Sequence, residues 1–81
     1  MPKPFHSYKD HPELAALGQA IRDTRLGFGL SQEALADDAG IDRSYMGGIE
    51  RGEHNLALIN INKIAKALDL SVTELMAKAN L

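Results

Sequence analysis

Polar side chains that can hydrogen bond to a phosphate or to the edge of a base gather in the middle of the chain. They are Gln32, Arg43, Ser44, Tyr45, Arg51, His54 and Asn55. The planar fork of an arginine matches the O6 and N7 atoms of guanine, and hydroxyl or amide groups commonly bind phosphate. Recognition of a nucleic acid is therefore a chemistry that these residue types can perform, if the fold gathers them on one exposed surface.

The same sequence offers little to catalysis or to metal binding. His6 and His11 fall in the first eleven residues, so His54 is the one histidine left in the rest of the chain. A histidine, a carboxylate and a nucleophile therefore cannot be placed at one plausible site. The chain has no cysteine, which excludes disulfides and thiolate metal sites, and no ligand spacing supports a site built from histidines. We expect no enzymatic activity, no metal and no cofactor.

Length and composition predict one small folded domain. The chain has 81 residues, of which 44% are hydrophobic and 25% are charged, as in ordinary globular proteins. Its formal net charge of −2 does not indicate a nucleic-acid partner, so such a role has to rest on the local arrangement of side chains. No apolar run is longer than four residues, as from Leu56 to Ile59, which is too short to span a bilayer, and the first residues lack the apolar segment of a secretory signal. We expect a cytoplasmic protein with no membrane association and no small-molecule substrate.

The elements that must position the polar side chains are predicted to be helices. Leucine and alanine supply 22 residues against nine β-branched ones, and no proline follows Pro12. Residues 1–11 lack periodicity and are expected to form a flexible arm, whereas residues 12–81 form the domain. Helix-start residues and apolar spacing predict five helices, namely one from Pro12 to about Gly27 or Gly29, then about 32–39, 43–51, a stretch between Gly52 and Asp69, and 72–79.

Local patterns support the starts and the buried faces of these helices. Ser31, Asp42 and Ser71 each stand where a hydrophobic staple places its N-cap, and Glu74 completes a capping box with Ser71. Met46 and Ile49, three residues apart, are expected in the core. The buried face of the fourth helix is predicted from apolar residues at helical spacing, which are Leu58, Ile61, Ile64, Ala65 and Leu68.

The second and third predicted helices are joined by a turn that is too tight for them to lie side by side. Gly40 can take the left-handed conformation that ends a helix, and Asp42 starts the next helix almost at once. The axes must therefore cross steeply, which is the geometry of a helix-turn-helix. Its second helix can enter a DNA major groove, about 12 Å wide, with its N-terminal side chains. Many small bundles also contain tight helical turns, so this geometry alone leaves both interpretations open.

Four blocks of the sequence resemble the Cro and phage-repressor (xenobiotic response element) type of helix-turn-helix family. They are SQEALA at 31–36, GIDRSY at 40–45, GIERG at 48–52 and KIAKAL at 63–68. Within that family the run DRSYMGGIERG at 42–52, followed by Asn55, is most similar to restriction-modification controller proteins. The resemblance covers about residues 14–76. It implies an all-α, compact five-helix bundle, a lambda-repressor-like DNA-binding domain, which acts as a homodimer on a palindromic operator in double-stranded DNA.

The resemblance also implies roles for the polar residues. Arg43 matches the position that reaches base edges, and Ser44 and Tyr45 follow on the same edge. Gln32 is expected across the phosphate backbone, and the group Arg51, His54 and Asn55 is expected to flank the same groove. His54 stands where the family usually has Arg or Lys, so a phosphate contact there is expected to be weaker and pH-dependent. An ordinary polar loop residue is the alternative for His54.

Further expectations concern two glycines of the third predicted helix and one pair of opposite charges. Gly47 and Gly48 weaken a helix, which suggests close approach by DNA, or else crowding against a neighbouring helix. Arg25 falls on the apolar face of the first helix, and the resemblance places Glu50 opposite it, so a partly buried ion pair is predicted. The alternative is that Arg25 reaches past the apolar surface to water. Ala57 stands where the family usually has a Ser or Thr cap.

The sequence also predicts a dimer interface, and it leaves three interpretations of the function open. The predicted interface is Ile59, Val72, Leu75, Met76 and Ala79. The leading interpretation is a transcriptional regulator of the controller class. A phage-type repressor, or an antitoxin that represses its own operon, is the alternative within the class. A protein-interaction module that has kept the fold and lost DNA binding is the alternative outside it.

Overall fold

The computed structural model describes residues 10–81, which form five α-helices and no strand. The predicted all-α fold class is confirmed, and the boundaries of the first, second, third and fifth helices agree with their predictions to within about a residue or two, the usual uncertainty of a helix end. The fourth helix lies inside the predicted stretch between Gly52 and Asp69. Nearly all of the predicted arm, residues 1–9, lies outside the described residues. The helices are α1 Pro12–Gly27, α2 Gln32–Ala39, α3 Arg43–Glu50, α4 Leu58–Ala67 and α5 Val72–Lys78.

Local capping interactions explain where α2 begins and ends and where α5 begins. The Ser31 hydroxyl accepts from the Ala34 N–H at 3.0 Å, and Gly40 ends α2 with φ of 68°. The capping box of α5 is formed, since the Ser71 hydroxyl accepts from the Glu74 N–H and the Glu74 carboxylate accepts from the Ser71 N–H. These bonds hold the pKa of Glu74 below its usual range. At the start of α4, Ala57 provides no side-chain cap, as its residue type predicts.

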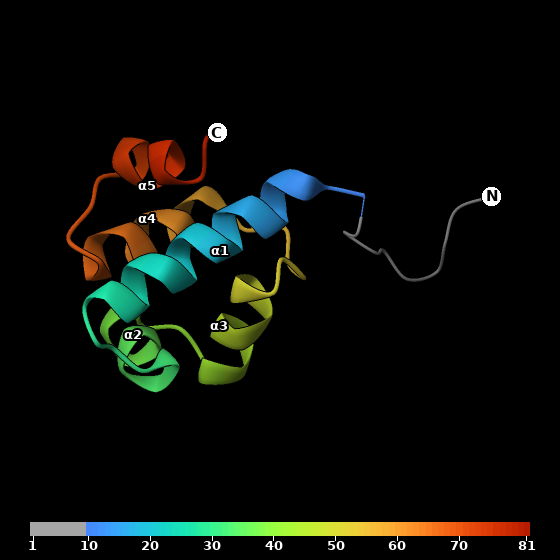
Figure 1. The fold of residues 1–81 in the computed structure, drawn as a ribbon. Helices are drawn as coiled ribbons and strands as arrows, with labels where there is room; N and C mark the ends of the chain where they lie inside the picture. The colour runs from blue at the N-terminus through green and yellow to red at the C-terminus, as the bar shows by residue number, and fades with distance from the viewer. Residues whose placement is uncertain (1–9) are drawn as a thin grey trace.

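The core lies where all five helices meet. Figure 1 shows α1 running across the middle of the molecule, with α3 packed on one side of it and α5 on the other. Met46 and Ile49 are buried, as predicted. The largest fully buried side chains come from every helix or its C-terminal cap, and they are Ile21, Leu35, Met46, Ile64, Leu68 and Leu75.

Leu58 was predicted on the buried face of α4, and this prediction is wrong. Its side chain is 69% exposed, whereas Ile64 further along the same helix is fully buried. At 3.6 residues per turn, two steps of three residues displace Leu58 by roughly 120° around the axis from Ile64. The displacement leaves Leu58 at the edge of the buried face, in the first turn, where no neighbouring helix covers it.

Close packing of α1 on α3 depends on a glycine in α1. A Cβ added to Gly18 would overlap the backbone carbonyl oxygens of Ile49 and Glu50, so only a glycine allows the two helices to approach this closely. Gly52, which follows α3 with φ of 75°, packs in turn against the backbone of Ala15. The C-terminal end of α3 and the turn after it are therefore held firmly against α1.

Candidate nucleic-acid interface

The turn between α2 and α3 contains the left-handed glycine and the N-cap residue that the sequence predicted. After left-handed Gly40, the Ile41 N–H donates to the Ala36 carbonyl oxygen at 2.9 Å and closes the end of α2. The Asp42 carboxylate then accepts from the N–H groups of Ser44 and Tyr45, at 3.0 and 3.3 Å, and starts α3. In Figure 1, α2 and α3 lie together at the bottom of the molecule, on the side away from α5.

The first turn of α3 presents polar side chains to solvent. Arg43 and Ser44 are exposed and Tyr45 is half-buried, whereas Met46 and Ile49 hold the opposite face of the helix in the core. The side chains that the sequence assigned to one edge of the second helix are therefore brought together on one exposed edge. Such an edge, on a helix anchored from behind, can enter a groove without unfolding.

A hydrogen-bonded network runs from the core to this edge. The predicted ion pair is formed, because Arg25 Nε and Nη2 donate to the Glu50 carboxylate at 2.7 and 3.0 Å and both residues are only 6% exposed. Arg25 Nη1 also donates to the Leu30 carbonyl oxygen at 2.8 Å. Gln32 extends the network, since its Nε2 donates to Glu50 at 2.9 Å and its Oε1 accepts from Arg43 Nη1 at 3.4 Å. The last distance is long for a hydrogen bond, so Arg43 is steadied but remains free to turn to a ligand.

The two α3 glycines are covered by the protein's own side chains. A Cβ on Gly48 would overlap the imidazole of His54, and one on Gly47 would lie 3.2 Å from Arg51 Nη1. Both glycines are buried without any DNA present. In the free protein, side chains from the turn after α3 therefore occupy the space beside both glycines, and close approach of DNA to them stays a prediction.

The predicted polar group after α3 contains an ion pair that sequence reasoning missed. Arg51 Nε and Nη2 donate to the two carboxylate oxygens of Glu53, at 2.9 and 3.2 Å. This pairing lowers the pKa of Glu53 and raises the pKa of Arg51. His54 leans on Tyr45 with ring centroids 4.5 Å apart, and Asn55 is exposed. Opposite charges two residues apart, on either side of Gly52, were the available signal for the ion pair.

Two of the residues predicted for the dimer interface belong to the core instead. Leu75 is fully buried and Ala79 is 7% exposed, so neither can form an exposed interface. The physical reason is that α5 directs its apolar face inward, against α1 and α4. Val72 and Met76 are half-buried against the same core, whereas Ile59 is 70% exposed.

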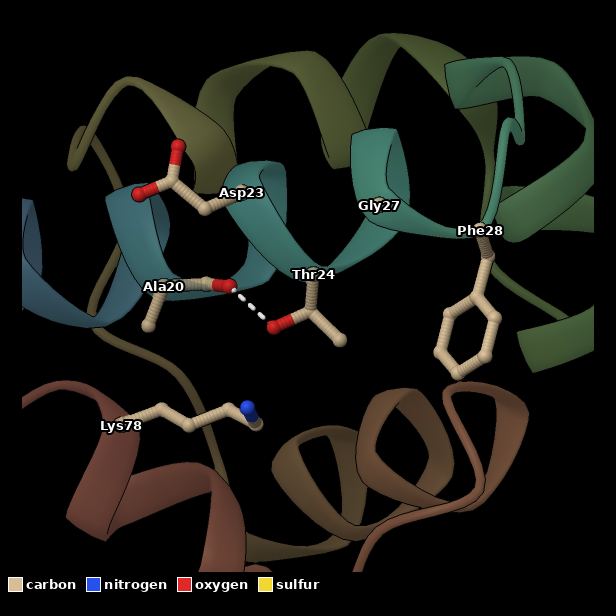
Figure 2. A pocket seen from close by; sticks show the side chains of 6 residues that line it. All are labelled: Ala20, Asp23, Thr24, Gly27, Phe28 and Lys78. Carbon is tan, nitrogen blue, oxygen red and sulfur yellow. Dashed lines mark hydrogen bonds between the residues drawn. The ribbon is translucent and has the colours of Figure 1, made fainter.

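Residues 10–81 offer little support for a metal site, a membrane-spanning helix or a ligand pocket beside α2 and α3. No group of three or more His, Cys, Asp or Glu residues in this part of the chain is arranged to hold a metal ion. None of the described helices is long and apolar enough to cross a membrane. An open hollow of about 440 Å³ lies between α1 and the end of α5, and none of its lining residues comes from α2 or α3 (Figure 2). It is lined by Ala20, Asp23, Thr24, Gly27, Phe28 and Lys78.

Comparison with known proteins agrees with this arrangement. Residues 21–75 match the family model described as Helix-turn-helix. The crystal structure of the restriction-modification controller protein C.AhdI from Aeromonas hydrophila is 51% identical, with a TM-score of 0.78 over 80% of this chain and 98% of that one. The structure of C.Esp1396I bound to a 25 base pair operator site is 32% identical, with a TM-score of 0.77 over 84% of this chain and 90% of that one. A hypothetical transcription factor of Neisseria meningitidis is 42% identical over 62 residues, and the match spans 76% of this chain and 58% of that protein.

Proposed function

The chain belongs to the helix-turn-helix family, and from that premise we propose that it is a sequence-specific DNA-binding transcriptional regulator of the restriction-modification controller class. The observation that carries this proposal is α3, whose polar first turn is exposed while its other face is anchored in the core. The 51% identity to C.AhdI favours this class over a phage-type repressor or an antitoxin. The proposal includes action in the cytoplasm and no catalytic role.

In this proposal, α3 reads bases and the segments on either side of it bind phosphates. Arg43 contacts a base edge with its guanidinium fork, and Ser44 and Tyr45 add contacts from the same turn. Gln32 lies across the phosphate backbone at the start of α2, and in the free protein its side-chain oxygen accepts from Arg43. Arg51, at the C-terminal end of α3, contacts a phosphate of the DNA backbone. His54 and Asn55 also flank the groove in this proposal.

The proposal is tested by selecting DNA from random and genomic fragments with the purified protein. We expect enrichment of a sequence with two-fold symmetry, bound more tightly than random duplex by at least about a thousandfold at moderate salt. Arg43→Ala is the control, because it should still bind at low salt but enrich the symmetric sequence much less strongly than the wild type does. Binding that is equally weak on all DNA would contradict a regulator and support a protein-interaction module.

We also propose a homodimer that uses the exposed start of α4. Leu58 and Ile59 are adjacent and are 69% and 70% exposed, which leaves an apolar patch without a partner in the monomer. Val72 and Met76 remain available at the edge of α5. A two-fold pairing can present two α3 helices about 34 Å apart, one turn of DNA, to the two halves of a palindrome.

Ile59→Glu is expected to convert the dimer to a monomer, because dimer formation would bury the new charge in an apolar contact. Sedimentation velocity at several protein concentrations measures this directly. Leu26→Glu is the matched control, since Leu26 is also exposed, at 52%, but lies at the C-terminal end of α1. A wild-type protein that sediments as a monomer at tens of micromolar, or a dimer that persists in Ile59→Glu, would refute this interface.

A further inference from the structure

We propose that Glu53 competes with the DNA backbone for Arg51, and so lowers the affinity for DNA and its dependence on salt. The inference rests on the proposed function and deepens it by naming a residue that weakens binding. Among Arg51, His54 and Asn55, the polar group after α3, Arg51 is the residue whose side chain is always positively charged.

The ion pair occupies one of the two edges through which the Arg51 guanidinium could hold a phosphate with two hydrogen bonds. Arg51 Nε and Nη2 each donate to a different oxygen of Glu53, at 2.9 and 3.2 Å, in the bidentate arrangement that arginine also uses for phosphate. The Glu53 carboxylate therefore stands in for a phosphate group. Both side chains are largely exposed, at 61% and 54%, so neither is needed to fill the core.

The backbone on which the pair stands is held in place. The Glu53 N–H donates to the Gly48 carbonyl oxygen at 2.9 Å, and Gly52 packs with positive φ against Ala15 of α1. Because the turn is fixed to both α1 and α3, Glu53 remains beside Arg51 in the free protein. The carboxylate also remains beside the proposed path of the DNA backbone when Arg51 turns to a phosphate.

Two costs follow when the protein binds DNA. Arg51 must leave or share Glu53 before it can bind a phosphate, and the ionised carboxylate then faces a polyanion. Glu53 is charged at neutral pH even when Arg51 leaves it, as a glutamate ordinarily is, and the pairing with Arg51 lowers its pKa further in the free protein. A phosphate contact made through an already neutralised arginine also displaces fewer counterions, which flattens the salt dependence of binding.

Glu53→Gln tests the inference because it keeps the size of the side chain and removes its charge. Binding is measured by fluorescence anisotropy on a labelled random-sequence duplex at several salt concentrations. We expect affinity to rise by about two- to five-fold, and the slope of log K against log salt to steepen by up to about one unit. Circular dichroism should show an unchanged fold.

Two controls separate competition for Arg51 from the general effect of removing a negative charge. Glu33→Gln removes the same charge from the first turn of α2, where no ion pair holds it, and is expected to leave the slope unchanged. In an Arg51→Ala background, Glu53→Gln should lose most of its effect, because no arginine remains to be released. An equal gain in both backgrounds would show that repulsion of DNA by the carboxylate accounts for the whole effect, without competition for Arg51, and would overturn the inference.

The remaining outcomes distinguish this inference from the proposed function. Wild-type binding that is unchanged in Glu53→Gln overturns the inference and leaves the proposed function intact. Failure of the wild type and of every variant to bind any duplex at low salt overturns both.

Discussion

Replacing Glu50 with alanine is expected to destabilise the protein by about 3–5 kcal/mol. The variant leaves Arg25 buried beside α3 without its carboxylate, and it also removes the acceptor of Gln32 Nε2. A buried charge without a partner costs far more than the loss of an exposed ion pair. Urea denaturation followed by circular dichroism measures the change in the free energy of unfolding.

The protein carries its own control for this prediction. Arg51 and Glu53 form an arginine–glutamate pair with similar distances but with exposed side chains, so Glu53→Ala should leave the free energy of unfolding close to that of the wild type. Replacing both members of the buried pair, as in Arg25→Met with Glu50→Leu, should recover part of the loss because no charge is then stranded. A loss below about 1 kcal/mol for Glu50→Ala would mean that solvent reaches this pair.

Arg43→Ala is expected to weaken binding to the selected operator by about 1–3 kcal/mol, and to weaken binding to random DNA much less. The reason is that only contacts to base edges carry sequence information. Arg51→Ala should instead weaken binding to both DNAs alike and flatten the salt dependence. Affinities of both variants on both duplexes, measured at several salt concentrations, test the assignment.

Arg43→Lys separates the charge of this residue from the shape of its guanidinium. Lysine keeps the positive charge but lacks the planar fork, so affinity for random DNA should be retained while preference for the operator falls. If Arg43→Ala loses equal affinity on the operator and on random DNA, Arg43 is a phosphate contact. Base reading would then belong to Ser44 or Tyr45, or to a residue outside the described part of the chain such as Lys3.

The sequence by itself determined where α1, α2, α3 and α5 begin and which turn joins α2 to α3. These features depend on groups only a few residues apart, such as Ser71 with Glu74 or Gly40 with Asp42, so no knowledge of distant neighbours is needed. The polar edge of α3 follows from the same local information, because Met46 and Ile49 mark the opposite face. The family resemblance supplied the one long-range contact that was predicted, between Arg25 and Glu50.

Only the tertiary structure decided which apolar and polar groups are already satisfied within one molecule. Helical periodicity assigned Leu58 to the core and Leu75 to a partner, yet packing exposes the first and buries the second, since burial depends on which neighbouring helix covers a given turn. The spacing of Arg51 and Glu53 is equally compatible with two separate solvated charges. Their pairing depends on the turn at Gly52, and that turn is held by contact with α1, which lies some 35 residues earlier in the chain.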